Sequence, residues 1–249
     1  MENLNQTTTK TGQNMKKLFV IAAVVSLIAV AKLGATTVTI DRVNGYYSGT
    51  GGEFNISQVL GGGYAASVLV NNNSGKLGFE TFCIEETEQV SIPGTYNAVR
   101  NPYGDALSGG VNLGAAGPDG GDPISIGTAY LYYNFAKGVL AGYNYTPGAG
   151  RITSAANLQS AIWYLENEIT LTPAQVLANS YLTLVSGLYG SSGEFANANG
   201  AFGVGALNNY YPSGSRAQDM LMLPDGGFTV MLLGMALGGF GLLARRIRA

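Results

Sequence analysis

Two uncharged apolar runs, residues 18–31 and 228–244, limit what this chain can fold into. Runs of this kind, without an alternating polar face, are typical of segments that enter a membrane. The stretch between them, residues 36–222, has the length of one ordinary domain. We therefore expect a single folded domain between two membrane-directed segments.

The first apolar run has the features of a secretory signal peptide. Two lysines precede it, and the small residues 29–31 suit cleavage. A membrane anchor fits less well, because the run is shorter than the roughly 20 residues of a spanning helix. We assign residues 15–35 to the signal peptide. The polar residues 1–14 fit no part of such a signal, so we expect them to be an upstream extension and Met15 to be the translation start.

The second apolar run is just long enough to span a membrane as a helix. Three basic residues follow it and are expected on the cytoplasmic side, which places everything before the run outside; they are Arg245, Arg246 and Arg248. A turn-forming motif directly precedes it, made of Leu223, Pro224, Asp225, Gly226 and Gly227.

The motif, apolar run and arginine cluster of residues 223–249 together resemble the PEP-CTERM sorting signal, in the variant called VPDSG-CTERM. Leu223 stands where that variant has valine, and Gly226 where it has serine. The resemblance implies that an exosortase, a membrane protease-transpeptidase, cleaves near the motif. The protein then moves to the surface or extracellular matrix of a Gram-negative bacterium, including its biofilm polymer. The alternative is a permanent single-pass anchor.

The composition excludes several classes of function. The chain has no histidine and one cysteine, which rules out Ser-His-Asp and Cys-His catalytic units, histidine metal sites and zinc fingers. Between residues 36 and 222, 13 acidic residues outnumber 6 basic ones, so a basic surface for nucleic acid is absent. We expect no enzyme activity, no metal, no cofactor and no nucleic-acid partner.

The pattern of apolar residues predicts an α+β fold, a β-rich ectodomain with a cluster of about three helices. Short β-favouring runs separated by polar turns predict strands over residues 66–71, 77–83, 88–92 and 216–223. Helical spacing predicts helices over residues 124–140, 153–169 and 172–190. In the first helix the expected core face is Ala129, Tyr132, Phe135, Ala136 and Val139, and in the second it is Leu158, Ala161, Ile162, Leu165 and Ile169.

Two of the helices also carry capping signals. Thr153 or Ser154 would cap the second helix, while Thr172 as N-cap and Pro173 at the first helical position would start the third. Gly187 or Gly190 would end the third helix. The glycine-rich residues 104–122 are expected to form a loop.

The lone cysteine, Cys83, is unusual in an exported protein, where cysteines generally pair. It is open to three explanations: an inert buried residue, a partner for another molecule, or a nucleophile that forms a bond other than a disulfide. Acidic residues follow directly in "FCIEETE", and nearby negative charge raises a thiol pKa. An ordinary reactive thiolate is therefore not indicated.

The segments "FCIE" around Cys83 and "LQSAIW" around Gln159 resemble the paired motifs of bacterial thioester domains. In that family a cysteine preceded by an aromatic residue or leucine pairs with a glutamine in an apolar-Gln-x-x-apolar-apolar motif. The resemblance covers roughly residues 77–170. It implies a bond from the sulfur of Cys83 to the side-chain carbonyl carbon of Gln159, formed with loss of ammonia. A suitable amine opens such a bond and becomes covalently attached.

Other constellations of acidic residues are weaker. Glu85, Glu86 and Glu88 with Glu166 and Glu168 resemble the carboxylate pair of a glycosidase only in composition, and charges at exposed strand and helix ends explain them better. Asp119 and Asp122 offer calcium-binding oxygens, but no full loop of ligands follows.

These features favour a non-enzymatic exported surface or matrix protein, delivered by an exosortase and attached to an amine-bearing partner through Cys83 and Gln159. The second hypothesis is a purely structural component of extracellular polymer without that bond, in which Ile162 and Trp163 are simply core residues. The third, a secreted hydrolase, lacks any recognisable motif. Proximity of the Cys83 sulfur to the Gln159 amide separates the first two.

Overall fold

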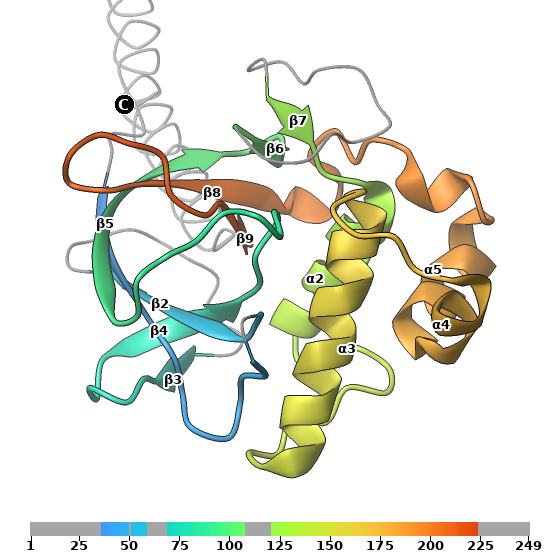
Figure 1. Cartoon of the computed structure of the whole chain (residues 1–249), viewed down its shortest axis with the longest axis horizontal. Coiled ribbons are helices and arrows are strands. Elements are labelled where there is room, and N and C mark those ends of the chain that lie inside the picture. Colours follow the sequence, from blue (N-terminus) through green and yellow to red (C-terminus); the bar gives the residue numbers. More distant parts are fainter. Residues whose placement is uncertain (1–35, 50, 59–68, 108–120, 224–249) are drawn as a thin grey trace, which may run out of the picture. The chain divides into compact units, whose positions relative to one another are not determined.

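The computed structural model describes residues 36–49, 51–58, 69–107 and 121–223 of the 249-residue chain (Figure 1). The predicted signal peptide, the apolar run at residues 228–244 and the arginine cluster lie outside these residues, as does all of the sorting motif except Leu223. Among the described residues, no helix combines the length and apolar character needed to cross a lipid bilayer.

The described chain is built on a seven-stranded antiparallel sheet with the strand order β3-β4-β2-β1-β5-β8-β9. Its strands are β1 Thr36–Asp41, β2 Phe54–Gln58, β3 Leu69–Asn71, β4 Leu77–Thr81, β5 Gly94–Asn101, β8 Gly205–Tyr210 and β9 Met220–Met222. A second, two-stranded sheet pairs β6 Asp105–Ala106 with β7 Asp122–Pro123.

The large sheet curls so that the chain just after β4 meets β9, the strand at the other end of the order. Cys83 forms an isolated antiparallel bridge with Met220, and the backbone N–H of Leu221 donates to the carbonyl oxygen of Phe82 at 3.1 Å. Because β9 and β4 lie near opposite ends of the strand order, these contacts fix the curvature of the sheet. Cys83 therefore sits where the sheet closes on itself.

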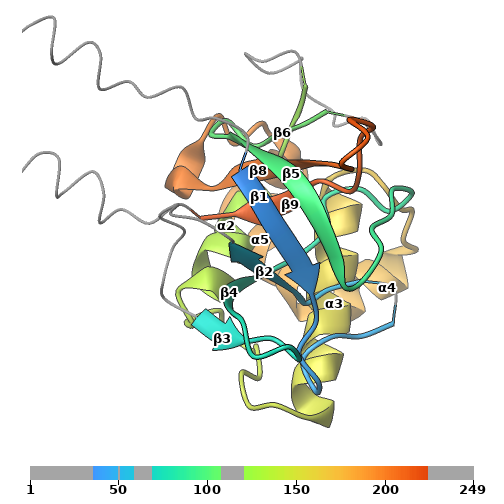
Figure 2. The same cartoon turned by 90° about the vertical axis from the view of Figure 1, so that its left-hand side faces the viewer.

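The helices follow one another in the chain and gather on one side of the sheet, as the two views show (Figures 1 and 2). They are α2 Ile126–Ala136, α3 Ala149–Leu165, α4 Pro173–Ala178 and α5 Ser180–Tyr189, with the short 3₁₀ helices η1 Gly193–Phe195 and η2 Ala201–Gly203. The long helix α3 runs beside the sheet in Figure 1.

The buried side chains form two apolar clusters. One joins the helices to the sheet and includes Phe82, Leu158 and Ile162, and the other fills the curled sheet and includes Cys83, Phe54 and Met220. Phe82 and Cys83 belong to different clusters because successive side chains of an extended chain point to opposite sides. Cys83 therefore faces the interior of the curled sheet, not the helical layer.

The α+β class predicted from the sequence is confirmed, with four α-helices in the described residues instead of about three. The predicted third helix divides at Asn179, whose side chain accepts from the backbone N–H groups of Tyr181 and Leu182 and so starts α5. Thr172 caps α4 with Pro173 at its first position, and Gly190 ends α5, as predicted.

The predicted strand over residues 88–92 is wrong, because this segment is irregular and the strand β5 begins only after it, at Gly94. Strand β5 follows immediately and pairs with both β1 and β8. Its pairing partners lie far away in the chain, and the alternation of burial along it depends on both neighbours. Local pattern therefore did not reveal it.

Two helix boundaries also differ from the prediction. The second helix begins at Ala149, with Gly148 as N-cap, so Thr153 and Ser154 lie inside it and cap nothing. The first helix ends at Ala136, which leaves Val139 65% exposed beyond it. The other four predicted core residues of that helix are buried, as are Leu158, Ala161, Ile162 and Leu165 of α3, whereas Ile169 lies past the end of α3.

A buried carboxyl group joins the end of α3 to the start of α2. The Oε1 atom of Glu166 accepts hydrogen bonds from the backbone N–H of Ser125 at 3.1 Å and from its hydroxyl at 2.9 Å. Ser125 is the N-cap of α2. Burial raises the pKa of Glu166 to about 7, against the lowering effect of the hydrogen bonds from Thr128 and Ser125.

We expect the contribution of Glu166 to the free energy of unfolding to fall as the pH rises from about 4.5 to about 7. Over this interval the folded protein keeps a proton that the unfolded chain has released, so raising the pH favours unfolding. A shift of this size corresponds to at most about 3 kcal/mol. Urea denaturation across this pH range measures the effect. Glu166→Gln keeps an accepting oxygen but does not titrate, so its stability should fall less steeply; parallel curves for the two proteins would contradict the assignment.

Candidate functional site

The glutamine predicted to react, Gln159, lies on the sheet-facing side of α3 and is 1% exposed. Its side-chain amide meets the backbone of Cys83 twice. The Nε2 atom of Gln159 donates to the carbonyl oxygen of Cys83 at 2.9 Å, and Oε1 of Gln159 accepts from the N–H of Cys83 at 3.1 Å. The structure therefore brings together the two residues that the sequence analysis singled out.

The amide oxygen of Gln159 has a second backbone donor. The N–H of Gly52 reaches it at 3.0 Å, so two N–H groups from separate segments point at the same oxygen. This is the arrangement that stabilises the negative charge of a tetrahedral intermediate in acyl transfer. It also satisfies the hydrogen-bonding needs of a buried amide that never reacts.

Two glycines allow the chain before β2 to approach this close. A Cβ atom at Gly51 would come within 2.6 Å of Gln159 Cγ, and one at Gly52 within 2.3 Å of the Phe82 ring. A side chain at either position would therefore push α3 or the strand end away. The pair Gly51-Gly52 is a feature that the sequence analysis did not recognise, although adjacent glycines mark places where backbone and side chain come close.

Cys83 itself is a buried free thiol, 3% exposed. Burial raises its pKa strongly, and the nearby charge of Glu85 raises it further, while Arg42 acts in the opposite direction. The thiol is therefore protonated at neutral pH. This agrees with the expectation that the acidic segment after Cys83 disfavours an ordinary thiolate.

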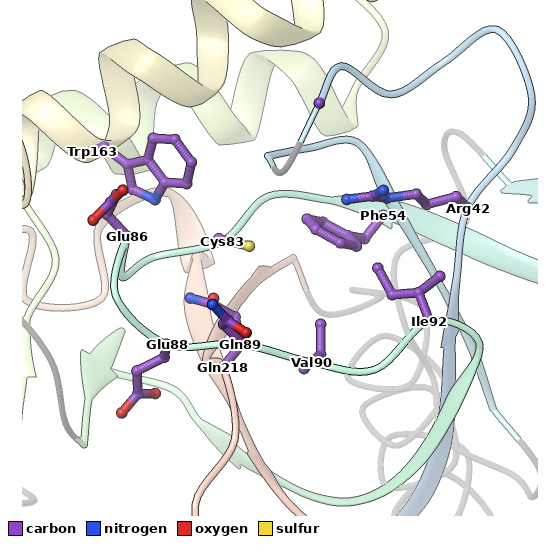
Figure 3. Close-up of a pocket in the computed structure, with 11 residues that line it drawn as sticks. Arg42, Phe54, Cys83, Glu86, Glu88, Gln89, Val90, Ile92, Trp163 and Gln218 are labelled. Atoms are coloured by element: carbon purple, nitrogen blue, oxygen red, sulfur yellow. The ribbon is translucent and has the colours of Figure 1, made fainter.

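A cavity of about 420 Å³ opens beside Cys83 (Figure 3). Figure 3 shows the sulfur atom between Trp163 and Phe54, with Glu86 on the Trp163 side and Arg42 on the Phe54 side. The cavity is lined by Arg42, Gly49, Phe54, Cys83, Glu86, Glu88, Gln89, Val90, Ile92, Trp163 and Gln218. It combines apolar walls with a charged rim, and it gives small molecules a way to the sulfur.

The side chains of the "LQSAIW" motif divide between core and cavity. Ile162 is fully buried in the cluster between helices and sheet. Trp163 is half-buried, packs against the cluster inside the curled sheet and forms one wall of the cavity. Trp163 is thus not simply a core residue, because one side of its ring faces the space next to Cys83.

An ion pair ties the first half of α3 to the start of β2. Arg151 donates to both carboxylate oxygens of Glu53, with an Nη2–Oε2 distance of 2.8 Å, and both residues are almost completely buried. The hydroxyl of Tyr143 also donates to Glu53, and the ring of Tyr46 covers the guanidinium at 3.5 Å. Glu53 directly follows Gly52 in the chain. The ion pair therefore fixes the segment whose N–H group donates to the Gln159 amide.

Among the acidic residues considered for a glycosidase, Glu86 and Glu88 line the cavity and the others are engaged elsewhere. Glu166 is engaged with Ser125, and Glu168 accepts from the backbone N–H of Glu86 at 2.9 Å. Glu85 is 1% exposed, and burial next to Asp219 raises its pKa to about 10. In the described part of the chain no group of three or more residues has the composition of a metal site. Asp119 lies outside that part.

Comparison of the chain with known protein families, with curated proteins and with solved structures finds no match.

We expect Gly51→Ala to lower the free energy of unfolding by about 1–3 kcal/mol, the usual cost of inserting a methyl group into a packed interior. Three hydrogen bonds hold the Gln159 amide, so Cγ cannot simply move aside. Urea denaturation measures the change. The matched control is Gly187→Ala, because Gly187 lies in α5 with open space around it. That variant should be neutral or up to about 1 kcal/mol more stable, and equal losses in both variants would argue against the close approach.

Proposed function

We propose that this chain is a non-enzymatic exported surface or extracellular-matrix protein that forms an internal thioester between Cys83 and Gln159. The observation that supports the proposal is the pair of hydrogen bonds between the Gln159 amide and the backbone of Cys83. They join the side chain of Gln159 on α3 to the backbone of Cys83 just after β4, the two residues that the resemblance pairs. The amide oxygen already accepts from two backbone N–H groups.

In the proposed step the sulfur of Cys83 attacks the Cδ atom of Gln159. The S–C bond forms, the C–N bond breaks, and the thiol proton leaves with the amide nitrogen as ammonia. Negative charge develops on Oε1 of Gln159, where Gly52 and Cys83 donate their N–H groups. The protonated state of the buried thiol suits this step, because the leaving nitrogen needs that proton.

In a second step, an amine opens the thioester and the amine-bearing partner becomes covalently attached. A primary amine attacks Cδ of Gln159, the C–S bond breaks, and the proton lost by nitrogen is balanced by one taken up at sulfur. The cavity reaches Cys83, which supplies the sulfur of this bond, with Phe54 and Trp163 as apolar walls and Glu86 and Glu88 at its rim. This lining fits an amine carried on an apolar stem, because the acids attract its positive charge.

The second candidate is a purely structural matrix protein with the same fold. The observation that favours it is the strong burial of Cys83, which keeps the thiol protonated and weakly nucleophilic. In this case the three hydrogen bonds of Gln159 serve only to fasten α3 to the sheet.

For delivery, we propose cleavage of residues 223–249 by an exosortase-like membrane transpeptidase. The support comes from the sequence: the LPDGG motif, the apolar run and the arginine cluster follow one another directly. The protein would be a transient single-pass membrane protein and then reach the cell surface or extracellular matrix.

The thioester predicts a mass deficit. The purified protein should weigh one ammonia less than its sequence, and methylamine should open the bond, leaving a methylamide on Gln159 and a free thiol on Cys83. Intact-mass spectrometry measures both. Cys83→Ala and Gln159→Ala should each abolish the deficit, while the control Gln175→Ala, which alters a glutamine in the exposed cap of α4, should keep it. Full sequence mass with no methylamine adduct would favour the structural alternative.

The sorting signal predicts processing in the native host. Replacing Arg245, Arg246 and Arg248 together should trap the full-length protein in the inner membrane. Replacing Pro224 and Asp225, as a separate variant, should do the same. Fractionation followed by immunoblotting separates the precursor from the shorter product. Full-length wild-type protein that stays in the inner membrane would instead indicate the permanent anchor.

A further inference from the structure

A second glutamine, Gln218, lines the cavity beside Cys83 and is 3% exposed (Figure 3). It directly precedes Asp219 and the strand β9, which closes the sheet against the chain at Cys83. The Nε2 atom of Gln218 donates to the backbone oxygen of Glu85 at 2.6 Å and to Oε2 of Glu85 at 3.1 Å.

These contacts fix which way the Gln218 amide points. A backbone carbonyl only accepts hydrogen bonds, so the atom that faces the Glu85 oxygen must be the nitrogen. The Oε1 atom of Gln218 consequently points away from Glu85. Within the described residues it accepts no hydrogen bond, and it is not one of the buried polar atoms without a partner, so solvent reaches it.

Glu85 is itself held in place. Its Oε2 atom also accepts from the backbone N–H of Asp219 at 3.2 Å, and Asp219 accepts from Asn208 at 2.8 Å and from the N–H of Leu107 at 2.9 Å. The Gln218 oxygen is thus a hydrogen-bond acceptor on a rigid support, next to the cavity that reaches the Cys83 sulfur. A buried network of this kind commonly holds a functional group in one orientation.

We propose that Gln218 is the positioning residue for the attacking amine, an inference that rests on the proposed thioester. Its Oε1 atom accepts one N–H of the amine and thereby directs the nitrogen lone pair at Cδ of Gln159. The N–C bond forms and the C–S bond breaks. One proton leaves the nitrogen to solvent and one is taken up by the Cys83 sulfur; the amide oxygen holds the N–H without taking its proton.

The role of Gln218 distinguishes nucleophiles that carry an N–H group from those that do not. A thiolate attacks the same carbon and breaks the same C–S bond, but it has no hydrogen to donate. Gln218 should therefore favour opening by methylamine and leave opening by methanethiolate unaffected. The two probes have similar size, so a change in access to the cavity alters both rates together.

The test uses the full-length protein and follows each opening by intact mass. Gln218→Met keeps the length of the side chain and removes the acceptor, so it should slow methylamine opening about tenfold, the effect of one lost hydrogen bond, without slowing methanethiol exchange. Gln218→Asn, which withdraws the oxygen from the cavity, should show the same selective loss if Gln218→Met fails to fold. The control is Gln89→Met, an exposed glutamine lining the same cavity, which should leave both rates unchanged.

Two further variants test whether Glu85 holds the Gln218 amide in its orientation. Glu85→Gln keeps the backbone oxygen and one accepting side-chain oxygen, so it should preserve selectivity for methylamine, whereas Glu85→Ala loses the side-chain oxygen and should reduce it. Equal slowing of both probes by Gln218→Met, or no slowing of either, overturns the role of Gln218 while leaving the thioester in place. A wild-type protein without the mass deficit overturns the thioester itself, and the positioning role with it.

Discussion

The hydrogen-bonded contact between the Gln159 amide and the Cys83 backbone is the link on which the rest of the arrangement depends. It joins the helical layer to the point where the sheet closes, and a third segment, Gly51-Gly52, completes it. Each of these segments belongs to a different part of the chain. A buried amide of this kind is costly when unpaired, so all three must be in place together.

The buried charges around this contact act as its frame. The ion pair of Glu53 and Arg151 joins two segments of the chain. Glu53 lies between Gly52 and β2, and Arg151 lies in the first turn of α3. Burial raises the pKa of Glu53 and that of the nearby Glu80, while the charge of Arg151 lowers both. A buried ion pair such as that of Glu53 and Arg151 adds little net stability, but removing one partner leaves an uncompensated buried charge. Its effect here is to restrict how α3 sits against the sheet.

The sequence predicted those parts that depend on local pattern. Thr172 and Pro173 marked a helix start because capping is decided within one turn. The periodic apolar residues of α3 marked a helix, but its first residue was misplaced because Gly148 caps it without a side chain. The strand β5 was missed because its partners β1 and β8 are distant in the chain.

The candidate site shows the same division. Cys83 and Gln159 were found from short motifs that resemble a known family, whereas residues that surround them were not. The ion pair of Glu53 with Arg151 joins positions far apart in sequence, and no spacing rule connects them. Glu85 appeared to be one of several surface acids, yet the curl of the sheet buries it against Gln218. Burial of that kind is a property of the closed sheet as a whole.

Burial favours the neutral forms of two groups at the site, the Cys83 thiol and the Glu85 carboxyl. Burial raises the pKa of the Cys83 thiol and that of Glu85, so neither carries charge at neutral pH. A free thiolate would react readily with many electrophiles, but it would supply no proton to a departing amide nitrogen. In the proposed thioester step a neutral thiol has that proton available, and two backbone N–H groups face the Gln159 oxygen on which charge would develop. The apolar surroundings that make the thiol a poor general nucleophile are therefore compatible with the single intramolecular step that we propose.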